Sequence, residues 1–380
     1  MLIVPIEEAR SGMKLAAPVL HPDNCEQELL RAGYVLEDVV LARLRTMGVP
    51  ALYVDYPDLS CLDAHLAVYL SPARQAVYNQ IKSVITEVQR QTRPAIPYAA
   101  YCDTTRELVQ TLMTQGKNPV YLEQMARRSV DAVAHAAAVS HLSLLLGLKL
   151  ESYLISERSR LPPMLARDVV NLGVAGMLHD LGLACLPAEM ASHVGPEPPE
   201  DPDQRRQWEL HPRTTYETIH GEVAPSVAGA VLQHHQHFDG SGFPPVRSGS
   251  GHGPLAGHQI HVFARILLCA DLYDRLATCP AGQRRRSNME ILHLMRTRYT
   301  GWCDPQIIRV LEAVAPPYPP GCRVKLSDGS LAVVIDISNA KPTQPVVRRL
   351  GEDRWTLVGE PLDLSRPDAP AIVDDFQNAN

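Results

Sequence analysis

The sequence has no Cys-x-x-Cys pair, although it contains eight cysteines. Scattered cysteines are typical of reduced thiols, so a disulfide framework and a zinc ribbon are both disfavoured and a cytoplasmic location is expected. The N-terminus has neither the basic start nor the long apolar core of a secretory signal. No window reaches about 18 consecutive apolar residues, so no membrane-spanning helix is predicted.

The chain also lacks an excess of basic residues, since its formal net charge is -6. Proteins that bind nucleic-acid polymers or anionic membranes usually have a basic face, so neither partner is expected here. A small anionic substrate is compatible with this charge if a bound metal supplies positive charge locally.

The pattern along the chain predicts several units, and 380 residues suffice for two or three domains. Short strands around a helical segment predict a small α/β domain over 1–60. Residues 61–120 are expected to form a helical connector, which is also a candidate element for a homodimer. From 121 to 316 helix follows helix with almost no strand alternation, which predicts an all-α domain. Helices are expected at 121–148, 164–181, 203–219, 222–236, 256–278, 288–299 and 304–314.

After the helical domain the pattern changes to strands. An Asp328-Gly329 turn between two apolar runs predicts a β-hairpin over 321–336. Further strands complete a small β extension over 317–364, and 365–380 is expected to be a loosely ordered tail. The expected fold class is therefore mainly α, an all-α bundle with a small α/β domain before it and a β extension after it.

The helical domain carries histidines and aspartates in apolar surroundings. His179-Asp180 ends the apolar helix 169–178, and Asp271 lies within the apolar run 266–274. An ionised carboxylate in such surroundings is costly unless it is paired or bound to a metal. We therefore expect one metal site, and a mixed His/Asp set favours iron or manganese over zinc. The candidate ligands are His135, His179, Asp180, His211, His234, His235 and Asp271, with Asp131 at the margin.

Each of these residues, taken alone, also has a simpler interpretation. His135 could be a hydrogen-bonded core histidine, and His179-Asp180 a pair at a helix end. Asp271 could be a buried salt-bridge partner, and Asp131 a polar residue on a helix surface. The ordered combination of all of them favours the shared site.

The order of these motifs resembles the HD-GYP domain, a branch of the HD phosphohydrolases. Two adjacent histidines close an apolar run, and an Asp-Gly-x-Gly-aromatic-Pro turn follows. The resemblance covers roughly residues 121–300. The N-terminal unit, through residues 4–13 and 52–55, resembles the small domain of unknown function often found ahead of it. The matching blocks are 175–182, His211-Pro212, His234-His235, 239–244 and 264–274.

The resemblance implies a metal-dependent hydrolase that cuts the bacterial messenger cyclic di-GMP to linear pGpG, with GMP as the product of a second cut. Two cations, iron or manganese, would activate a hydroxide and neutralise charge on the phosphoryl oxygens, with His179 and Asp180 at the catalytic centre. By position, one metal would be held by His135, His179, Asp180 and Asp271, and the other by Asp180, His211, His234 and His235.

The resemblance also implies that the 239–244 turn binds substrate and a partner protein, and that a third metal is possible. Asp131 stands where some members place a glutamate that holds a third metal. Diguanylate cyclase (GGDEF) domains are the implied protein partners of the turn. The residues of the turn expected to bind substrate are Asp239, Gly240, Gly242, Phe243 and Pro244.

Four positions depart from the family pattern. Leu183 replaces a lysine thought to help hold the phosphate, and Gln236 replaces a glutamate. Phe243 replaces a tyrosine, and Pro280 stands where a basic residue is expected. Two alternatives therefore stay open: a weakened homologue that binds cyclic di-GMP or a partner protein without cutting, and an HD phosphohydrolase for another nucleotide. The 239–244 turn disfavours the second.

Overall fold

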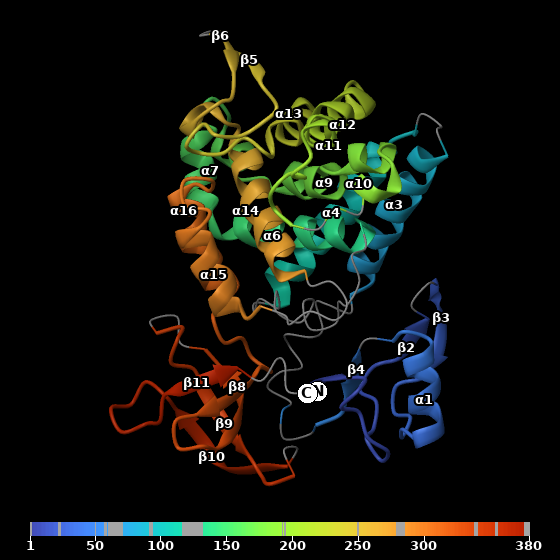
Figure 1. Ribbon diagram of the computed structural model, residues 1–380, viewed down its shortest axis with the longest axis vertical. Helices are drawn as coiled ribbons and strands as arrows, with labels where there is room; N and C mark the ends of the chain where they lie inside the picture. Colours follow the sequence, from blue (N-terminus) through green and yellow to red (C-terminus); the bar gives the residue numbers. More distant parts are fainter. Residues whose placement is uncertain are drawn as a thin grey trace.

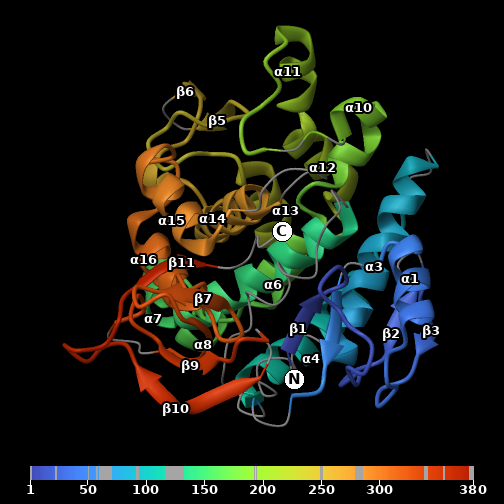
Figure 2. The same ribbon diagram turned by 60° about the horizontal axis from the view of Figure 1, so that its bottom comes forward.

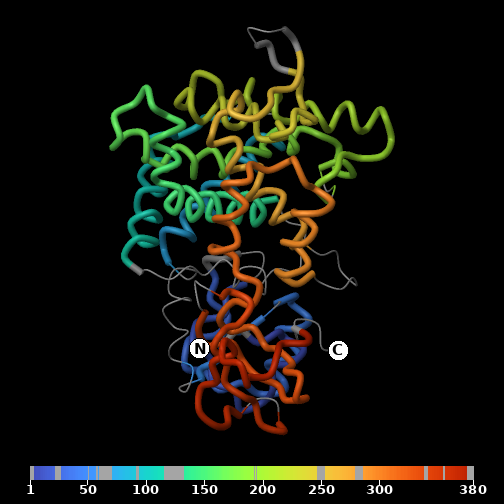
Figure 3. The backbone as a smooth tube through the Cα atoms, turned by 90° about the vertical axis from the view of Figure 1, so that its left-hand side faces the viewer, coloured from blue at the N-terminus to red at the C-terminus, as the bar shows by residue number. Residues whose placement is uncertain are grey.

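The computed structural model consists of a helical part and a smaller part made of strands from both ends of the chain (Figure 1). The tube in Figure 3 separates the two parts and shows the first and last segments of the chain lying together. The mainly α fold class predicted from the sequence is confirmed. The structure describes residues 2–21, 24–49, 51–56, 59, 71–90, 94–115, 132–191, 193, 195–248, 251–278, 286–337, 341–353 and 356–375.

The helical part is organised around α14 (Val262–Ala277), in which every side chain from Val262 to Leu276 is buried. α6 (Ala132–Lys149), α9 (Val170–Leu178) and α13 (Pro225–Gln233) pack against it. α6, α9 and α14 are buried along most of their length, which agrees with their largely apolar sequences. The other helices of this part are α7 (Glu151–Glu157), α8 (Pro163–Ala166), η2 (Leu181–Cys185), α10 (Ala188–Ala191), η3 (Gly257–Gln259), α15 (Asn288–Thr297) and α16 (Pro305–Val314).

Within the described part of the chain, α6 is the one helix with the length and composition of a membrane span. Its apolar window is 72% buried inside the protein, which is typical of the core helix of a globular domain. The same helix carries His135, a candidate metal ligand.

The region predicted as a connector contributes to the helical core. It contains two helices, α3 (Pro72–Gln89) and α4 (Tyr98–Gln115). Val77, Ile81 and Val84 of α3 lie in the same hydrophobic cluster as the buried residues of α6 and α9. These two helices therefore belong to the helical part and do not merely link it to another unit.

The prediction of a single helix over 203–219 is wrong, because the structure has two helices in this region. α11 (Pro202–Trp208) ends before His211, and α12 (His211–Ile219) begins there. Pro212 has no N–H to continue a helix but suits the first turn of a new one. The break places the imidazole of His211 at a helix start, where it can face another element.

The two ends of the chain share one hydrophobic core. Val333 and Leu350 of the C-terminal sheet pack in the same cluster as Val4, and Arg323 forms an ion pair with Glu8. Figure 2 shows the two sets of strands side by side. The C-terminal sheet is antiparallel with strand order β10-β9-β8-β7-β11. The elements of this part are β1 (Leu2–Pro5), β2 (Val19–His21), β3 (Asn24–Leu30), α1 (Asp38–Thr46), β4 (Ala51–Val54), β7 (Arg323–Leu326), β8 (Leu331–Asp336), β9 (Val346–Leu350), β10 (Leu357–Asp363) and β11 (Ile372–Asp375).

The prediction of a loosely ordered tail over 365–380 is wrong for the segment that forms β11. This strand pairs with β7, placing Asp374 opposite Lys325. An open edge on β7 would expose unpaired backbone groups, and β11 covers that edge. The helical part carries a further hairpin that was not predicted, formed by β5 (Val246–Ser248) and β6 (Gly251–Gly253). It projects from the end of the molecule farthest from the strand-rich part (Figure 1).

Candidate metal centre

His179 and Asp180 stand at the end of α9, where the helix gives way to η2. The Nδ1 atom of His179 lies 2.9 Å from the carbonyl oxygen of Gly176 and donates to it, which leaves the Nε2 lone pair free for a metal. A Cβ on Gly176 would lie 2.5 Å from the Cα of Ser140 in α6. Glycine therefore allows α9 and α6 to approach closely, and His179 comes to lie beside His135.

The first cluster consists of His135 on α6, His179 and Asp180 at the end of α9, and Asp271 on α14. One ligand atom from each of these four residues lies within 4.8 Å of the others. The Nε2 atom of His135 is 2.9 Å from Oδ1 of Asp271 and 3.4 Å from Oδ2 of Asp180. The Nε2 atom of His179 is 3.4 Å from the same Oδ2. Two imidazoles and two carboxylates that face one point can hold a divalent transition metal.

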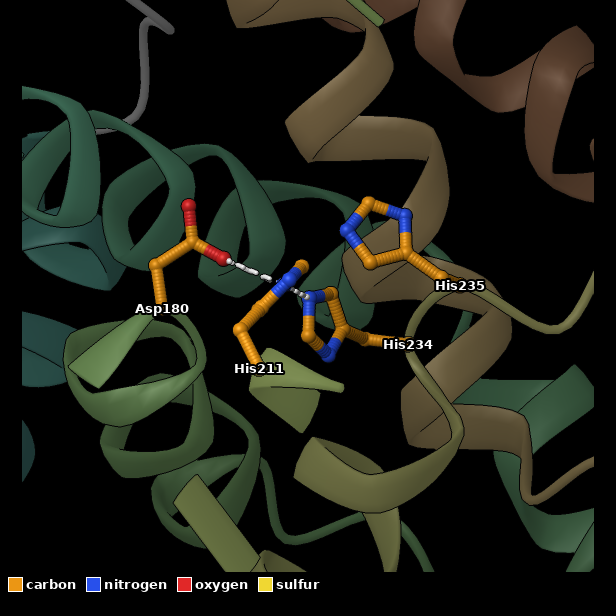
Figure 4. Close-up of side chains that lie close together, drawn as sticks. All are labelled: Asp180, His211, His234 and His235. Atoms are coloured by element: carbon orange, nitrogen blue, oxygen red, sulfur yellow. Dashed lines mark hydrogen bonds and ion pairs between the residues drawn. The ribbon is translucent and has the colours of Figure 1, made fainter. Parts of the chain in front are cut away.

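The second cluster uses the other oxygen of Asp180. The Nε2 atoms of His211 and His234 lie 3.2 Å and 3.5 Å from its Oδ1 atom, and Figure 4 shows both rings turned toward it. Their Nδ1 atoms donate to the carbonyl oxygens of Trp208 and Val231 over 2.7 Å and 2.6 Å. The cluster gathers one carboxylate and three buried imidazoles: Asp180, His211, His234 and His235.

Several metal-ligand atoms of both clusters are buried and make no well-directed hydrogen bond to another described residue. Leaving such an atom unsatisfied costs about 1–3 kcal/mol, so proteins rarely retain one without a purpose. Cations placed in the two clusters would satisfy these atoms together, so the residues fit bound metal. The atoms are Nε2 of His135, Nε2 of His179, Oδ1 of Asp180 and Nε2 of His235.

Aromatic side chains hold the second cluster in place. The ring of Phe243 stacks on His235 with a centroid distance of 4.6 Å and an interplanar angle of 20°. Trp208 is fully buried and packs edge-on against His211, with a centroid distance of 4.9 Å. Two aromatic neighbours restrict how far these imidazoles can turn. Trp208 was not predicted as part of the site.

The Asp-Gly-x-Gly-aromatic-Pro turn braces the same cluster. The side chain of Gln236 donates to the carbonyl oxygen of Pro244 over 2.5 Å and accepts from the backbone N–H of Leu255 over 2.7 Å. A Cβ on Gly242 would lie 2.3 Å from the carbonyl oxygen of His235, so only glycine fits there. Contact with substrate stays a prediction for the residues of the turn: Asp239, Gly240, Gly242, Phe243 and Pro244.

A cavity of about 270 Å³ opens over the first cluster. His135, Asp180 and Arg275 contribute to its wall, which is otherwise largely apolar. Leu183 lies in this wall, where the resemblance leads us to expect a lysine in other members. Of the described residues that line the cavity, Arg275 is the only one that is a lysine or an arginine. It therefore supplies positive charge that Leu183 does not.

Two residues of α14 complete the first cluster and were not predicted. The Nδ1 atom of His135 donates to Oδ2 of Asp274 over 2.7 Å. The guanidinium of Arg275 donates to Oδ1 of Asp271 over 2.7 Å and to Oδ2 of Asp180 over 2.5 Å. Residues three and four positions after Asp271 share its helix face, and this spacing is the signal in the sequence that points to both.

Two further predictions cannot be placed. Asp131, the marginal ligand for a third metal, and Pro280, the replacement of a basic residue, lie outside the described residues. Arg286 is a basic residue close in sequence to Pro280, and the structure describes it. Its guanidinium donates to the carbonyl oxygen of Leu276 over 3.0 Å and so satisfies the end of α14.

The imidazoles of the two clusters differ in charge. Burial lowers the pKa of His135 and His179, but the neighbouring carboxylates outweigh burial and raise the pKa to about 10 and about 9. In the second cluster burial is the largest influence, and it lowers the pKa of His234 to about 4. Below its pKa a histidine is protonated, so at pH 7 the metal-free first cluster carries imidazolium groups, whereas His234 is neutral.

These charges can be read directly from the ¹⁵N spectrum of the histidine-labelled, metal-free protein at pH 7. His135 and His179 should give imidazolium signals, and His234 should be neutral with its proton on Nδ1, because that atom donates to Val231. Single His→Asn variants assign the signals. A charged His234, or one protonated on Nε2, would contradict this account of the ligand geometry.

Comparison with known proteins relates the helical part to one family. The family model for the HD domain matches residues 124–307. The chain is 26% identical over 332 residues to the cyclic di-GMP phosphodiesterase PA4108 of Pseudomonas aeruginosa. This similarity covers 80% of this chain and 75% of that protein. The chain is 28% identical over 167 residues to the cyclic di-GMP phosphodiesterase response regulator RpfG of Xanthomonas campestris pv. campestris, covering 41% of this chain and 39% of that protein.

Among solved structures, the chain is similar to Bd1817, an HDG"Y"P protein from Bdellovibrio bacteriovorus. The similarity covers 82% of this chain and 98% of that one, with 17% sequence identity and a TM-score of 0.45. A score at this level does not relate the two folds in detail.

Proposed function

Because this chain belongs to the HD-GYP branch of the HD domain family, we propose that it is a metal-dependent phosphodiesterase that hydrolyses cyclic di-GMP to linear pGpG. The observation that carries the proposal is the pair of four-residue clusters that share Asp180. Several of their buried ligand atoms make no well-directed hydrogen bond to another described residue, and a cavity is lined by His135 and Asp180 of the first cluster. The names of the two sequence relatives support the same substrate.

Hydrolysis adds one water across one P–O3′ ester bond of the substrate. Divalent cations, when bound, would lower the pKa of that water and neutralise charge on the phosphoryl oxygens. The chain's own part is to hold its imidazoles as neutral ligands. Backbone carbonyls accept the Nδ1 protons of His179, His211 and His234, so the Nε2 atoms of these rings point into the clusters. Asp180 has one oxygen toward each cluster and therefore sets their separation.

Iron and manganese are the metals we propose, because imidazole and carboxylate ligands without thiolate suit them. We further propose that the protein acts in the cytoplasm, which the free cysteines among the described residues support. A homodimer and docking of GGDEF domains at the 239–244 turn stay proposals of the same kind. The exposed carboxylate of Asp239 offers such a partner a charged contact.

A second candidate function is binding of cyclic di-GMP without cleavage. The apolar side chain of Leu183 in the cavity wall favours it, since a lysine there would help to hold a phosphate. Gln236 does not favour it, because its amide has a structural role in bracing Pro244 and Leu255.

Product chromatography separates the two candidates. Full-length protein, purified without oxygen and loaded with Fe(II) or Mn(II), should convert cyclic di-GMP to pGpG, and chelator-treated protein should not. Cyclic di-AMP serves as the control for another nucleotide. Intact cyclic di-GMP after hours, together with calorimetric binding of it, would refute the hydrolase and favour the binding module.

A further inference from the structure

The guanidinium of Arg275 lies inside the first cluster. Its Nε atom is 2.7 Å from Oδ1 of Asp271, and its Nη2 atom is 2.5 Å from Oδ2 of Asp180. The side chain is 7% exposed and starts one helical turn after Asp271. A buried guanidinium with two carboxylate partners is held firmly in the site, because moving it away would break two buried ion pairs.

Arg275 contacts the same carboxylate oxygens that face the imidazoles of the first cluster. Oδ2 of Asp180 and Oδ1 of Asp271 lie 2.9–3.6 Å from the Nε2 atoms of His135 and His179. Oδ1 of Asp180 faces the imidazoles of the second cluster, and no guanidinium of the described residues contacts it. A metal in the first cluster must therefore compete with the guanidinium for its oxygens, whereas a metal in the second cluster has no such competitor.

The charges of the described residues agree with this asymmetry. Asp180, Asp271 and Asp274 contribute three carboxylates at or near the cluster, and each is at most 10% exposed. Arg275 already balances one of these three negative charges. It therefore leaves less negative charge in the first cluster to stabilise a divalent cation, which is costly to bury without enough anions.

We propose that Arg275 takes the place of a cation in the first cluster, so that this chain binds one divalent metal tightly, in the second cluster. A second metal enters the first cluster only when the guanidinium moves off its carboxylates. The inference rests on the proposed function, because it concerns the same two clusters, but it can fail while that function stands.

Titration of the metal-free full-length chain with Mn(II) tests the inference, with free Mn(II) followed by electron paramagnetic resonance. The wild type should bind one tight equivalent and a second at least about tenfold more weakly. Arg275→Ala should bind two equivalents of similar affinity, and Arg275→Lys, which keeps the charge, should behave like the wild type. Arg213→Ala is the matched control, because its side chain is 65% exposed on the helix that carries His211.

The outcomes are distinguishable. Two equally tight equivalents in the wild type would overturn the inference and leave the phosphodiesterase proposal in place, and this result needs no variant to fold. A folded Arg275→Ala protein that still binds one tight equivalent would also overturn it. No tight equivalent in the wild type would overturn both the inference and the proposed metal dependence.

Discussion

Replacing Asp180 with asparagine is expected to remove metal from both clusters and to lower the rate of cyclic di-GMP hydrolysis by roughly 10³- to 10⁴-fold. The reason is geometric: one oxygen of this carboxylate faces His135 and His179, and the other faces His211 and His234. Asparagine keeps the shape but loses the charge and one acceptor. Metal analysis and product chromatography on the same preparation measure both effects.

Asp203→Asn is the control for this change. Its side chain is 77% exposed on α11, close in sequence to His211, and it forms an ion pair with the exposed Arg206. It should leave metal content and rate unchanged. A folded Asp180→Asn protein that keeps its metal would show that the two clusters are not joined through this residue.

Gly182→Ala is expected to disturb the second cluster without touching a ligand. A Cβ at this position would lie 2.4 Å from the carbonyl oxygen of His211 and 2.9 Å from Oγ1 of Thr215. The backbone N–H of Gly182 donates to that Oγ1 over 2.8 Å, so the two segments cannot separate without losing a hydrogen bond. We expect a loss of about 1–3 kcal/mol in the free energy of unfolding and metal binding weaker by roughly 10- to 100-fold.

Gly229→Ala provides the matched control. Gly229 lies in α13, the helix directly before His234 of the second cluster. A Cβ there would meet no heavy atom within 4 Å. Alanine in a helix should stabilise the protein by about 0.5–1 kcal/mol and leave metal binding as in the wild type. Chemical denaturation and metal titration of both variants give the comparison. Wild-type metal affinity in Gly182→Ala would mean that this close packing does not position His211.

Ionisable residues in apolar helices predicted one shared site, because such residues have few other stable environments. The division into two groups came from the resemblance to the HD-GYP domain, and the structure brings together the same two sets of residues. The sequence did not reveal Arg275 as a member of the first cluster. The spacing of Arg275 from Asp271 is visible in the sequence, but an arginine on a helix is usually exposed. Only the packing of α14 against α6 and α9 turns this side chain inward.

Other differences arise from contacts between distant segments. The shared core of Val4 and Val333, and the pairing of β11 with β7, join residues that are hundreds or tens of positions apart. Local patterns carry little information about such pairings. The break before His211 was readable in principle, since Pro212 follows it, but the surrounding helical pattern masked it.

We propose that metal binds at the clusters that share Asp180, and most tightly in the second of them. Anomalous diffraction from crystals of the full-length chain grown with Mn(II), recorded where manganese scatters anomalously, tests it most directly. The account predicts a strong peak within coordination distance of Asp180, His211, His234 and His235, and a weaker one, or none, beside Arg275. A map with no peak in either cluster, although the crystals contain manganese, would contradict it.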